Sequence, residues 1–185
     1  MQTAQRLRMT ADDFLAWEET QTEKHEFVAG EVFAMVGARR EHVVVSGNIF
    51  AGLKQRLRGK PCQAYMADLK LRVEAADAFF YPDVVVSCDQ NDNKADQYIS
   101  HPTLIVEVLS DSTAAYDRGG KFVAYRTLDS LKEYLIVDIE AHRVESFRRT
   151  ANNDWLLHDY VGVVDCELTG LNLSLPLADI FEDIG

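Results

Sequence analysis

The stretches YPDVVV at residues 81–86 and LIVEVL at residues 104–109 decide the fold. Each is an apolar strand pattern that one acidic residue interrupts, Asp83 in the first stretch and Glu107 in the second. Burying an unpaired carboxylate costs several kcal/mol, so two carboxylates in such strands need partners. With Lys121 in the next predicted helix, they indicate a metal-binding pocket rather than an accident of packing.

Length and composition predict one domain over residues 1–185 with a sizeable core. Hydrophobic residues make up 47% of the chain and charged residues 26%, which is an ordinary globular balance. No apolar run reaches the roughly 18 residues that a membrane helix needs. Residues 1–8 are polar and unlike a signal peptide. We therefore expect a cytoplasmic protein.

The net charge of −11 is unfavourable for nonspecific nucleic-acid binding, which depends on Lys and Arg neutralising phosphates. Basic residues gather at residues 39–60 and 143–149, so a local basic patch stays open. Solvated helix and hairpin faces are the favoured interpretation of both groups.

Cys62, Cys88 and Cys166 are the three cysteines of the chain. Their number is odd and they contain no CxxC pair, so neither a disulfide framework nor a zinc cluster is indicated. Reduced, mostly buried thiols are the expected state.

The apolar periodicity predicts an α/β or α+β layer fold, a mixed sheet flanked by helices. Thr10 is expected to cap a first helix, with Asp13 completing a capping box. A hairpin precedes the predicted sheet, a meander follows it, and a polar, mobile loop is expected at residues 89–101. The other expected elements are helices at about 41–57 and 114–128, strands at 63–73, 79–87, 103–109 and 133–139, the hairpin at 26–36, the meander at 143–160, and a last strand and helical turn over 163–181.

Asp83 and Glu107 lie 24 positions apart on two separate predicted strands. If these strands are neighbours, the two carboxylates meet near the strand ends, where they suit Mg²⁺ or Mn²⁺. Such a metal lowers the pKa of a water and stabilises charge on a phosphate. Lys121 is the best-placed lysine to hold the attacking water. The structural alternatives are a turn for Asp83, a buried ion pair for Glu107 and an exposed helix position for Lys121.

Further candidates flank this pair. Asp68 and Lys70 share the polar face of strand 63–73, where they either add a metal ligand and a second lysine or face solvent. Glu41 and His42 begin a helix, a place that favours a carboxylate on electrostatic grounds alone. The hairpin acids Glu26 and Glu31 are expected to border the site. Asp111 and Asp117, which follow Glu107, are not assigned to catalysis. The other histidines are interpreted as surface or structural residues; they are His25, His101, His142 and His158.

Over about residues 9–181 the chain resembles the Uma2 family, a group of proposed endonucleases. Any one of the matching pieces is common, but together they are specific. They are HEFVAGE at residues 25–31, DLKLRV at 68–73, YPDVVV at 81–86, LIVEVLS at 104–110 and YDRGGKF at 116–122.

The resemblance implies a restriction-endonuclease-like fold of the PD-(D/E)XK group and metal-dependent hydrolysis of DNA. It implies that Asp83 and Glu107 are the metal ligands. On the residue pattern alone, Asp68 or an acid near Glu41 would add a further ligand. The lysine of the motif should stand two positions after Glu107, where this chain has Leu109. A displaced lysine, Lys121 or Lys70, would have to replace it.

Two alternatives to a nuclease stay open. One is a non-catalytic binding or regulatory module that keeps the fold and the acidic pocket, which Leu109 favours. The other is an oligomer, such as a homodimer, that uses the meander at residues 143–160 as an edge.

Overall fold

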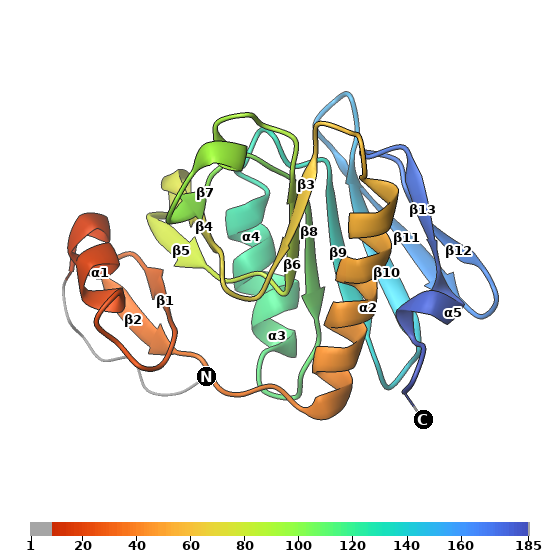
Figure 1. The fold of residues 1–185 in the computed structure, drawn as a ribbon, viewed down its shortest axis with the longest axis horizontal. Helices are drawn as coiled ribbons and strands as arrows, with labels where there is room; N and C mark the ends of the chain where they lie inside the picture. Colours follow the sequence, from red (N-terminus) through yellow and green to blue (C-terminus); the bar gives the residue numbers. More distant parts are fainter. Residues whose placement is uncertain (1–8, 185) are drawn as a thin grey trace.

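The computed structural model describes residues 9–184 and shows a layered α+β architecture (Figure 1). The polar segment 1–8, which we compared with a signal peptide, lies outside the described residues. A six-stranded sheet forms the centre, with α2 (Arg40–Arg56) on one face. A second, five-stranded sheet and the segment containing α3 (Ala114–Tyr116) and α4 (Phe122–Tyr125) cover the other face. Within this range, no helix is long and apolar enough to cross a membrane.

The central sheet has the strand order β11-β10-β9-β8-β6-β3. β8 and β9 are parallel, and every other neighbouring pair is antiparallel. The apolar side chains at every fourth position of α2, Val45, Ile49 and Leu53, are buried against one face. The strands are β3 (Gln63–Met66), β6 (Val84–Ser87), β8 (Pro102–Val108), β9 (Glu133–Asp138), β10 (Arg143–Arg149) and β11 (Trp155–Val161); the hairpin β12 (Asp165–Leu168) and β13 (Leu173–Pro176), with α5 (Leu177–Ile180), packs beside α2.

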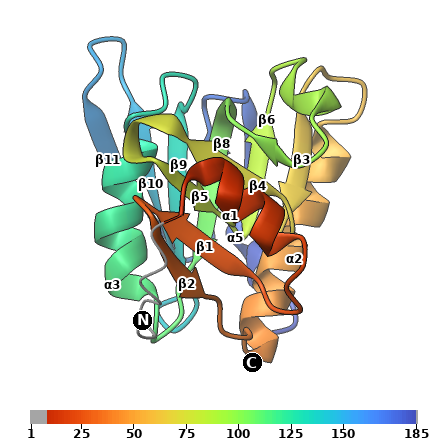
Figure 2. The ribbon, with the colours of Figure 1, turned by 90° about the vertical axis from the view of Figure 1, so that its left-hand side faces the viewer.

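The smaller sheet has the order β2-β1-β5-β4-β7. We call α1 (Ala11–Glu18), β1 (His25–Val28) and β2 (Glu31–Ala34) the N-terminal unit. Figure 2 views this unit from outside, with α1 lying over the sheet. Phe14 of α1 stacks on Phe27 and Phe79, and the Thr10 capping box starts the helix as expected. The other strands are β4 (Lys70–Val73), β5 (Ala78–Phe80) and β7 (Tyr98–Ile99), and short 3₁₀ turns cover Glu74–Ala76 and Asp92–Lys94.

Two strands predicted as continuous are each broken into two strands of different sheets. Ala67 has a φ of 54°, in the left-handed region, so the chain turns between β3 and β4. The other break falls at Tyr81-Pro82-Asp83, where proline has no N–H to give to a strand ladder. The first break is hidden because both halves of residues 63–73 keep the same period of two. The second break lies in a run that is apolar nearly throughout, which is typical of one central strand. As a result, Asp83 stands directly before β6.

The predicted helix at residues 114–128 is interrupted by a π-helical turn over Asp117–Lys121. This turn contains Gly119 and Gly120, and a Cβ on Gly120 would collide with the Tyr116 ring. Such wide turns are rare and occur often at functional sites. Here the turn buries both Asp117 and Lys121.

The expectation of reduced thiols is wrong for two of the cysteines, because Cys62 and Cys88 form a disulfide. In the antiparallel pair of β3 and β6, Gln63 lies opposite Ser87, so the next position outward sets Cys62 opposite Cys88. The pairing depends on strand neighbours, which a spacing of 26 residues does not show. Cys166 is free and buried, as expected.

We expect the double substitution Cys62→Ser/Cys88→Ser to lower the free energy of unfolding. Closing a loop with a sequence separation of 26 residues restricts the unfolded chain, which corresponds to about 3.5 kcal/mol in the chain-entropy treatment. Urea denaturation of the oxidised protein and the double variant measures the difference, and the reduced wild type is the matched control. Equal stability of all three would contradict this assignment.

Candidate functional site

Glu107 is a buried carboxylate in the middle of the central sheet. All seven residues of β8 are buried, and Glu107 is only 3% exposed. Its Oε1 accepts hydrogen bonds from the Tyr125 hydroxyl at 2.8 Å and from Lys121 Nζ at 3.2 Å. The helical segment after β8 therefore supplies both donors that hold this oxygen.

Lys121 is a buried ammonium, 6% exposed, surrounded by three carboxylates. Its Nζ lies 2.9 Å from Glu26 Oε1, 3.2 Å from Glu107 Oε1 and 3.5 Å from Asp117 Oδ1. Glu26 comes from β1, Glu107 from β8 and Asp117 from the π-helical turn. Lys121 thus connects its own π-helical turn to β1 and β8 through ion pairs.

Asp83 joins this group through the neighbouring strand. Val84 lies opposite Val106 in the β6–β8 register, so continuing it by one residue places Asp83 opposite Glu107. Asp83 Oδ2 accepts the backbone N–H of Val108 at 2.8 Å and lies 3.2 Å from His42 Nε2. From residues 9–184, the second oxygens Asp83 Oδ1 and Glu107 Oε2 receive no hydrogen bond.

Burial and excess negative charge perturb this cluster, which we define as Glu26, Asp83, Glu107, Asp117 and Lys121. Burial raises the pKa of Glu107 well above its usual value despite Lys121, and the other three acids add to the rise. Burial likewise raises the pKa of Asp117. Burial alone would lower the pKa of Lys121, but its carboxylate partners outweigh burial and raise it. Lys121 therefore faces three of these carboxylates, and the fourth, Asp83, pairs with His42.

His42 holds Asp83 from the first turn of α2. Burial disfavours its charged form, but the hydrogen bond to Asp83 and the charge of that carboxylate raise the pKa of His42 overall. His42 is thereby favoured as a cation beside Asp83 and fixes the position of this carboxylate.

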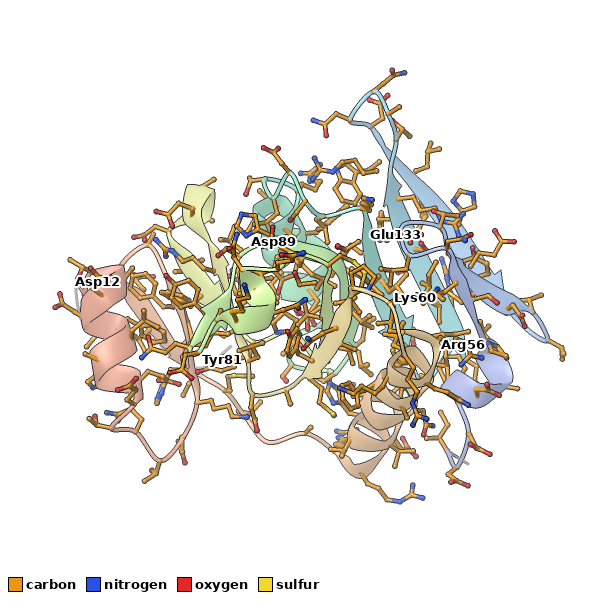
Figure 3. The ribbon with its side chains drawn as sticks, turned by 45° about the horizontal axis from the view of Figure 1, so that its top comes forward. Asp12, Arg56, Lys60, Tyr81, Asp89 and Glu133 are labelled. Carbon is orange, nitrogen blue, oxygen red and sulfur yellow. A yellow bond between two sulfur atoms is a disulfide. The ribbon has the colours of Figure 1, made fainter. Side chains whose placement is uncertain are left out.

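The structure brings together Asp83, Glu107 and Lys121, with His42 next to Asp83. The other candidates lie elsewhere. The side chain of Asp68 is 79% exposed and pairs with Lys24, and Glu41 is exposed on α2. The Nζ of Lys70 lies 5.6 Å from the centroid of the Tyr81 ring, and Figure 3 labels Tyr81 where the N-terminal unit meets the rest of the protein.

Sequence reasoning placed Glu26 only at the border of the site and left Asp117 out. Glu26 contacts Lys121 directly, and Asp117 stands four residues before this lysine. Besides that spacing, Asp117 lies in the piece YDRGGKF that matches the Uma2 family. Glu26 lies in the matching piece HEFVAGE, but its contact with Lys121 depends on packing of the N-terminal unit.

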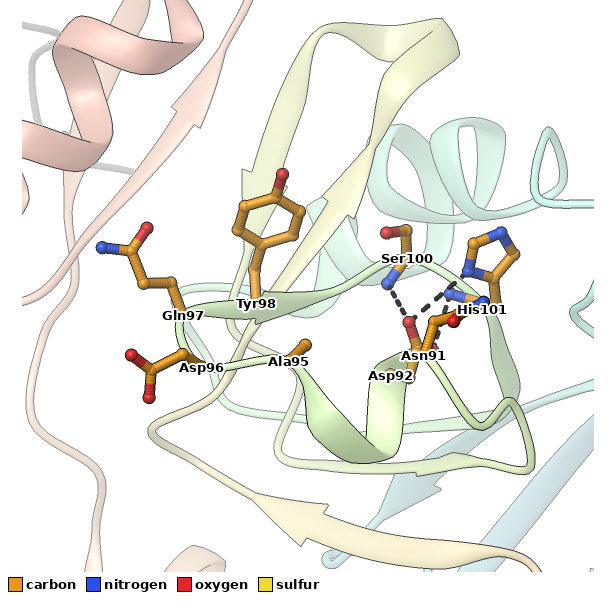
Figure 4. A pocket seen from close by; sticks show the side chains of 8 residues that line it. All are labelled: Asn91, Asp92, Ala95, Asp96, Gln97, Tyr98, Ser100 and His101. Atoms are coloured by element: carbon orange, nitrogen blue, oxygen red, sulfur yellow. Dashed lines mark hydrogen bonds and ion pairs between the residues drawn. The ribbon is translucent and has the colours of Figure 1, made fainter.

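A second group, Asp89, Asp92 and His101, has ligand atoms within 4.8 Å of one another. It lies beside a shallow pocket of about 390 Å³ (Figure 4). Asp92 is already saturated, because it accepts hydrogen bonds from Ser87 Oγ and from the backbone N–H groups of Ser100 and His101. These bonds hold Asp92 within the loop at residues 89–101, and they account for the buried carboxylate without a metal.

The carboxylates of the first cluster do fit a divalent cation. Carboxylate oxygens are the ligands that Mg²⁺ and Mn²⁺ prefer. Asp83 and Glu107 each keep one oxygen without a hydrogen-bond donor among the described residues. Asp117 Oδ1 is buried and also lacks a hydrogen bond. The excess negative charge would be neutralised by a cation held there.

In the described residues, a layered α+β fold places an acid before one central strand, a buried acid on the next strand and a lysine beside it. The model of the Uma2 family, described as "Putative restriction endonuclease", matches residues 11–178. The chain belongs to the Uma2 family, and the expected fold class is confirmed.

Two similar proteins come from Synechocystis sp., and both are described as uncharacterized. The protein slr1290 is 36% identical over 177 residues, which cover 96% of this chain and 93% of that protein. The protein sll1609 is 34% identical over 157 residues, covering 83% of this chain and 88% of that protein.

A crystal structure from Anabaena variabilis shares the fold. It is described as a "putative nuclease belonging to DUF820" and superposes with a TM-score of 0.72 at 16% identity, covering 94% of this chain and 97% of that one. At this level of identity, the likeness shows the fold alone.

We expect Glu107→Gln to raise the thermal midpoint at pH 8. The pKa of Glu107 is higher in the folded protein than its usual value of 4.5. The wild type therefore loses stability as pH rises from this usual pKa through the pKa of the folded state, because the buried carboxyl group becomes charged. The amide oxygen still accepts from Tyr125 and Lys121, and Lys121 keeps Glu26 and Asp117. The gain should shrink towards pH 5, as followed by circular dichroism.

Glu133→Gln is the matched control. Glu133 is equally buried but pairs with Arg148 at 2.8 Å outside the cluster (Figure 3 labels Glu133). Removing its charge leaves Arg148 without its carboxylate, so this variant should melt below the wild type at pH 8. A Glu107→Gln midpoint that also falls below the wild type would contradict the excess of negative charge.

Proposed function

We propose that this protein is a Mg²⁺- or Mn²⁺-dependent endonuclease that hydrolyses phosphodiester bonds of DNA. The observation that carries this proposal is the contact of Lys121 with Glu107 beside Asp83. Family membership and the shared fold support a nuclease, while the reaction and its metal are our own inference. Two acids and a lysine are the groups that in-line attack by water on a phosphate requires.

Each residue has a defined part in this proposal. Asp83 and Glu107 would hold the cation through the oxygens that accept no hydrogen bond in the described structure. When bound, the cation supplies positive charge that activates water and neutralises the phosphate. Lys121 orients the water and stabilises developing negative charge. His42 and Tyr125 are positioning residues, because they hold Asp83 and Glu107 by one oxygen each.

The geometry supports Lys121 over Lys70 as the displaced lysine. Lys121 Nζ lies 3.2 Å from Glu107, whereas Lys70 contacts the Tyr81 ring. Leu109, in the usual place of the motif lysine, packs against the core between the two sheets. Lys121 reaches the acids from the helical segment and packs over the Phe80 ring of the same core, where its charge is paired with carboxylates.

Binding of DNA must depend on local cations, because the chain carries a net charge of −11. The arginines at residues 143–149 are occupied by carboxylates and backbone carbonyls. Lys54, Arg58 and Lys60 have no carboxylate partner within residues 9–184, but Figure 3 places Lys60 on the α2 side, away from Tyr81. We infer weak, strongly salt-dependent binding of long duplexes. A cytoplasmic location and a homodimer stay predictions.

The second candidate is a non-catalytic binding or regulatory module that retains the fold. Leu109 in the motif position and the acidic surface charge favour it. The two functions differ in one result, which is whether the charged cluster is needed for DNA cleavage.

We expect Lys121→Met to lower the rate of plasmid nicking in Mn²⁺ by about 100-fold or more, the usual cost of removing a group that stabilises transition-state charge. Lys70→Met should keep at least about a tenth of the rate, because Lys70 does not contact the two acids. Asp83→Asn should behave like Lys121→Met. Cleavage of supercoiled plasmid and of short duplexes, at low and physiological salt, measures these rates.

Lys94→Met, on an exposed 3₁₀ turn, is the control for loss of a surface charge. Equal loss in Lys70→Met and Lys121→Met would overturn the choice of lysine. Cleavage that survives Asp83→Asn and Lys121→Met in folded protein, or no cleavage by the wild type with either metal, would favour the binding module.

A further inference from the structure

Asp117 carries a buried oxygen that the described structure leaves without a hydrogen bond. The residue is 2% exposed, and Oδ1 accepts no hydrogen bond among the described residues, although it forms an ion pair with Lys121 Nζ at 3.5 Å. The Thr113 side chain contributes a hydrogen bond to the same carboxyl group. Buried carboxylate oxygens usually have donors, and leaving one unpaired costs free energy. The protein thus maintains an unfavourable arrangement here, which needs a physical reason.

The backbone enforces this arrangement. The π-helical turn over Asp117–Lys121 buries both ends of the turn, and the Tyr134 hydroxyl donates to the Asp117 carbonyl at 3.0 Å. A residue with a Cβ atom does not fit at position 120, because this atom would collide with the Tyr116 ring. Figure 1 shows this segment running beside β8. Asp117 therefore does not reach the cluster through a flexible side chain on the surface; its place is built into the fold.

Neutralising Lys121 does not explain Asp117. Lys121 already has closer partners in Glu26 at 2.9 Å and Glu107 at 3.2 Å. A third carboxylate adds negative charge to a group that already has more acids than bases. This excess is unfavourable in the protein alone but favourable once a divalent cation enters.

We propose that Asp117 is a further carboxylate of the cation site and binds the divalent ion, directly or through one water, by its Oδ1. This inference rests on the proposed function, since it adds a ligand to the same site. It assigns a role to an acid that sequence reasoning left out of catalysis. It also separates two roles in the turn, with Asp117 serving the cation and Lys121 serving the water and phosphate.

The test is calorimetric titration of Mn²⁺ into the full chain without DNA. We expect Asp117→Asn, which keeps size and shape, to weaken Mn²⁺ binding by about 10-fold to 100-fold, as loss of a ligand or its supporting group does. Asp111→Asn is the matched control, because Asp111 lies six positions earlier and pairs with Arg39 on the surface. It should bind Mn²⁺ within about twofold of the wild type.

A double-mutant cycle with Lys121→Met separates a direct role from one through the lysine. If Asp117 acts on the cation, Asp117→Asn weakens Mn²⁺ binding by a similar factor in the wild-type and Lys121→Met backgrounds. If Asp117 only positions Lys121, the loss disappears in the Lys121→Met background, and the inference is overturned.

The outcomes also distinguish this inference from the proposed function. The role of Asp117 alone would be overturned if the wild type binds Mn²⁺, Glu107→Gln abolishes this binding and Asp117→Asn leaves it unchanged. Wild type that binds no Mn²⁺ would overturn the cation site as a whole. Should Asp117→Asn fail to fold by circular dichroism, Asp117→Ser removes the same carboxylate from a smaller side chain and carries the same expectation.

Discussion

The buried contact between Glu107 and Lys121 is the interaction on which the rest of the structure depends. A carboxylate near the end of a fully buried strand requires a partner, and the ammonium comes from the helical segment that follows β8. Tyr125 supplies a second donor to the same oxygen. The π-helical turn, the break before β6 and the docking of the N-terminal unit all bring polar groups to this point.

In the proposed function, the cluster serves cation binding at the expense of stability. Lys121 and His42 together do not balance four carboxylates, and burial raises the pKa of Glu107 and Asp117. A site of this kind is stabilised when a cation binds, because the ion interacts with the folded chain and not with the unfolded one. The contact of Glu26 with Lys121 also makes the N-terminal unit part of the site rather than a separate attachment.

Much of the fold and the centre of the candidate site follow from local sequence. Acids in apolar runs identified Asp83 and Glu107, and helical spacing gave α2 and its buried side chains. The break at Ala67 was not predicted because alternation continues across it. The break at Tyr81-Pro82-Asp83 was not predicted because residues 79–87 are apolar nearly throughout. The Cys62–Cys88 disulfide and the place of Glu26 depend on which strands and layers become neighbours. Local periodicity holds no information about such long-range packing.

Anomalous scattering from crystals grown with Mn²⁺ tests the central claim most directly. The expected result is a manganese peak within about 2.5 Å of carboxylate oxygens of both Asp83 and Glu107, with Lys121 beside them. A peak only at Asp89, Asp92 and His101, or no peak while Lys121 stays closed on Glu107, would contradict the assignment of the buried cluster as a cation site.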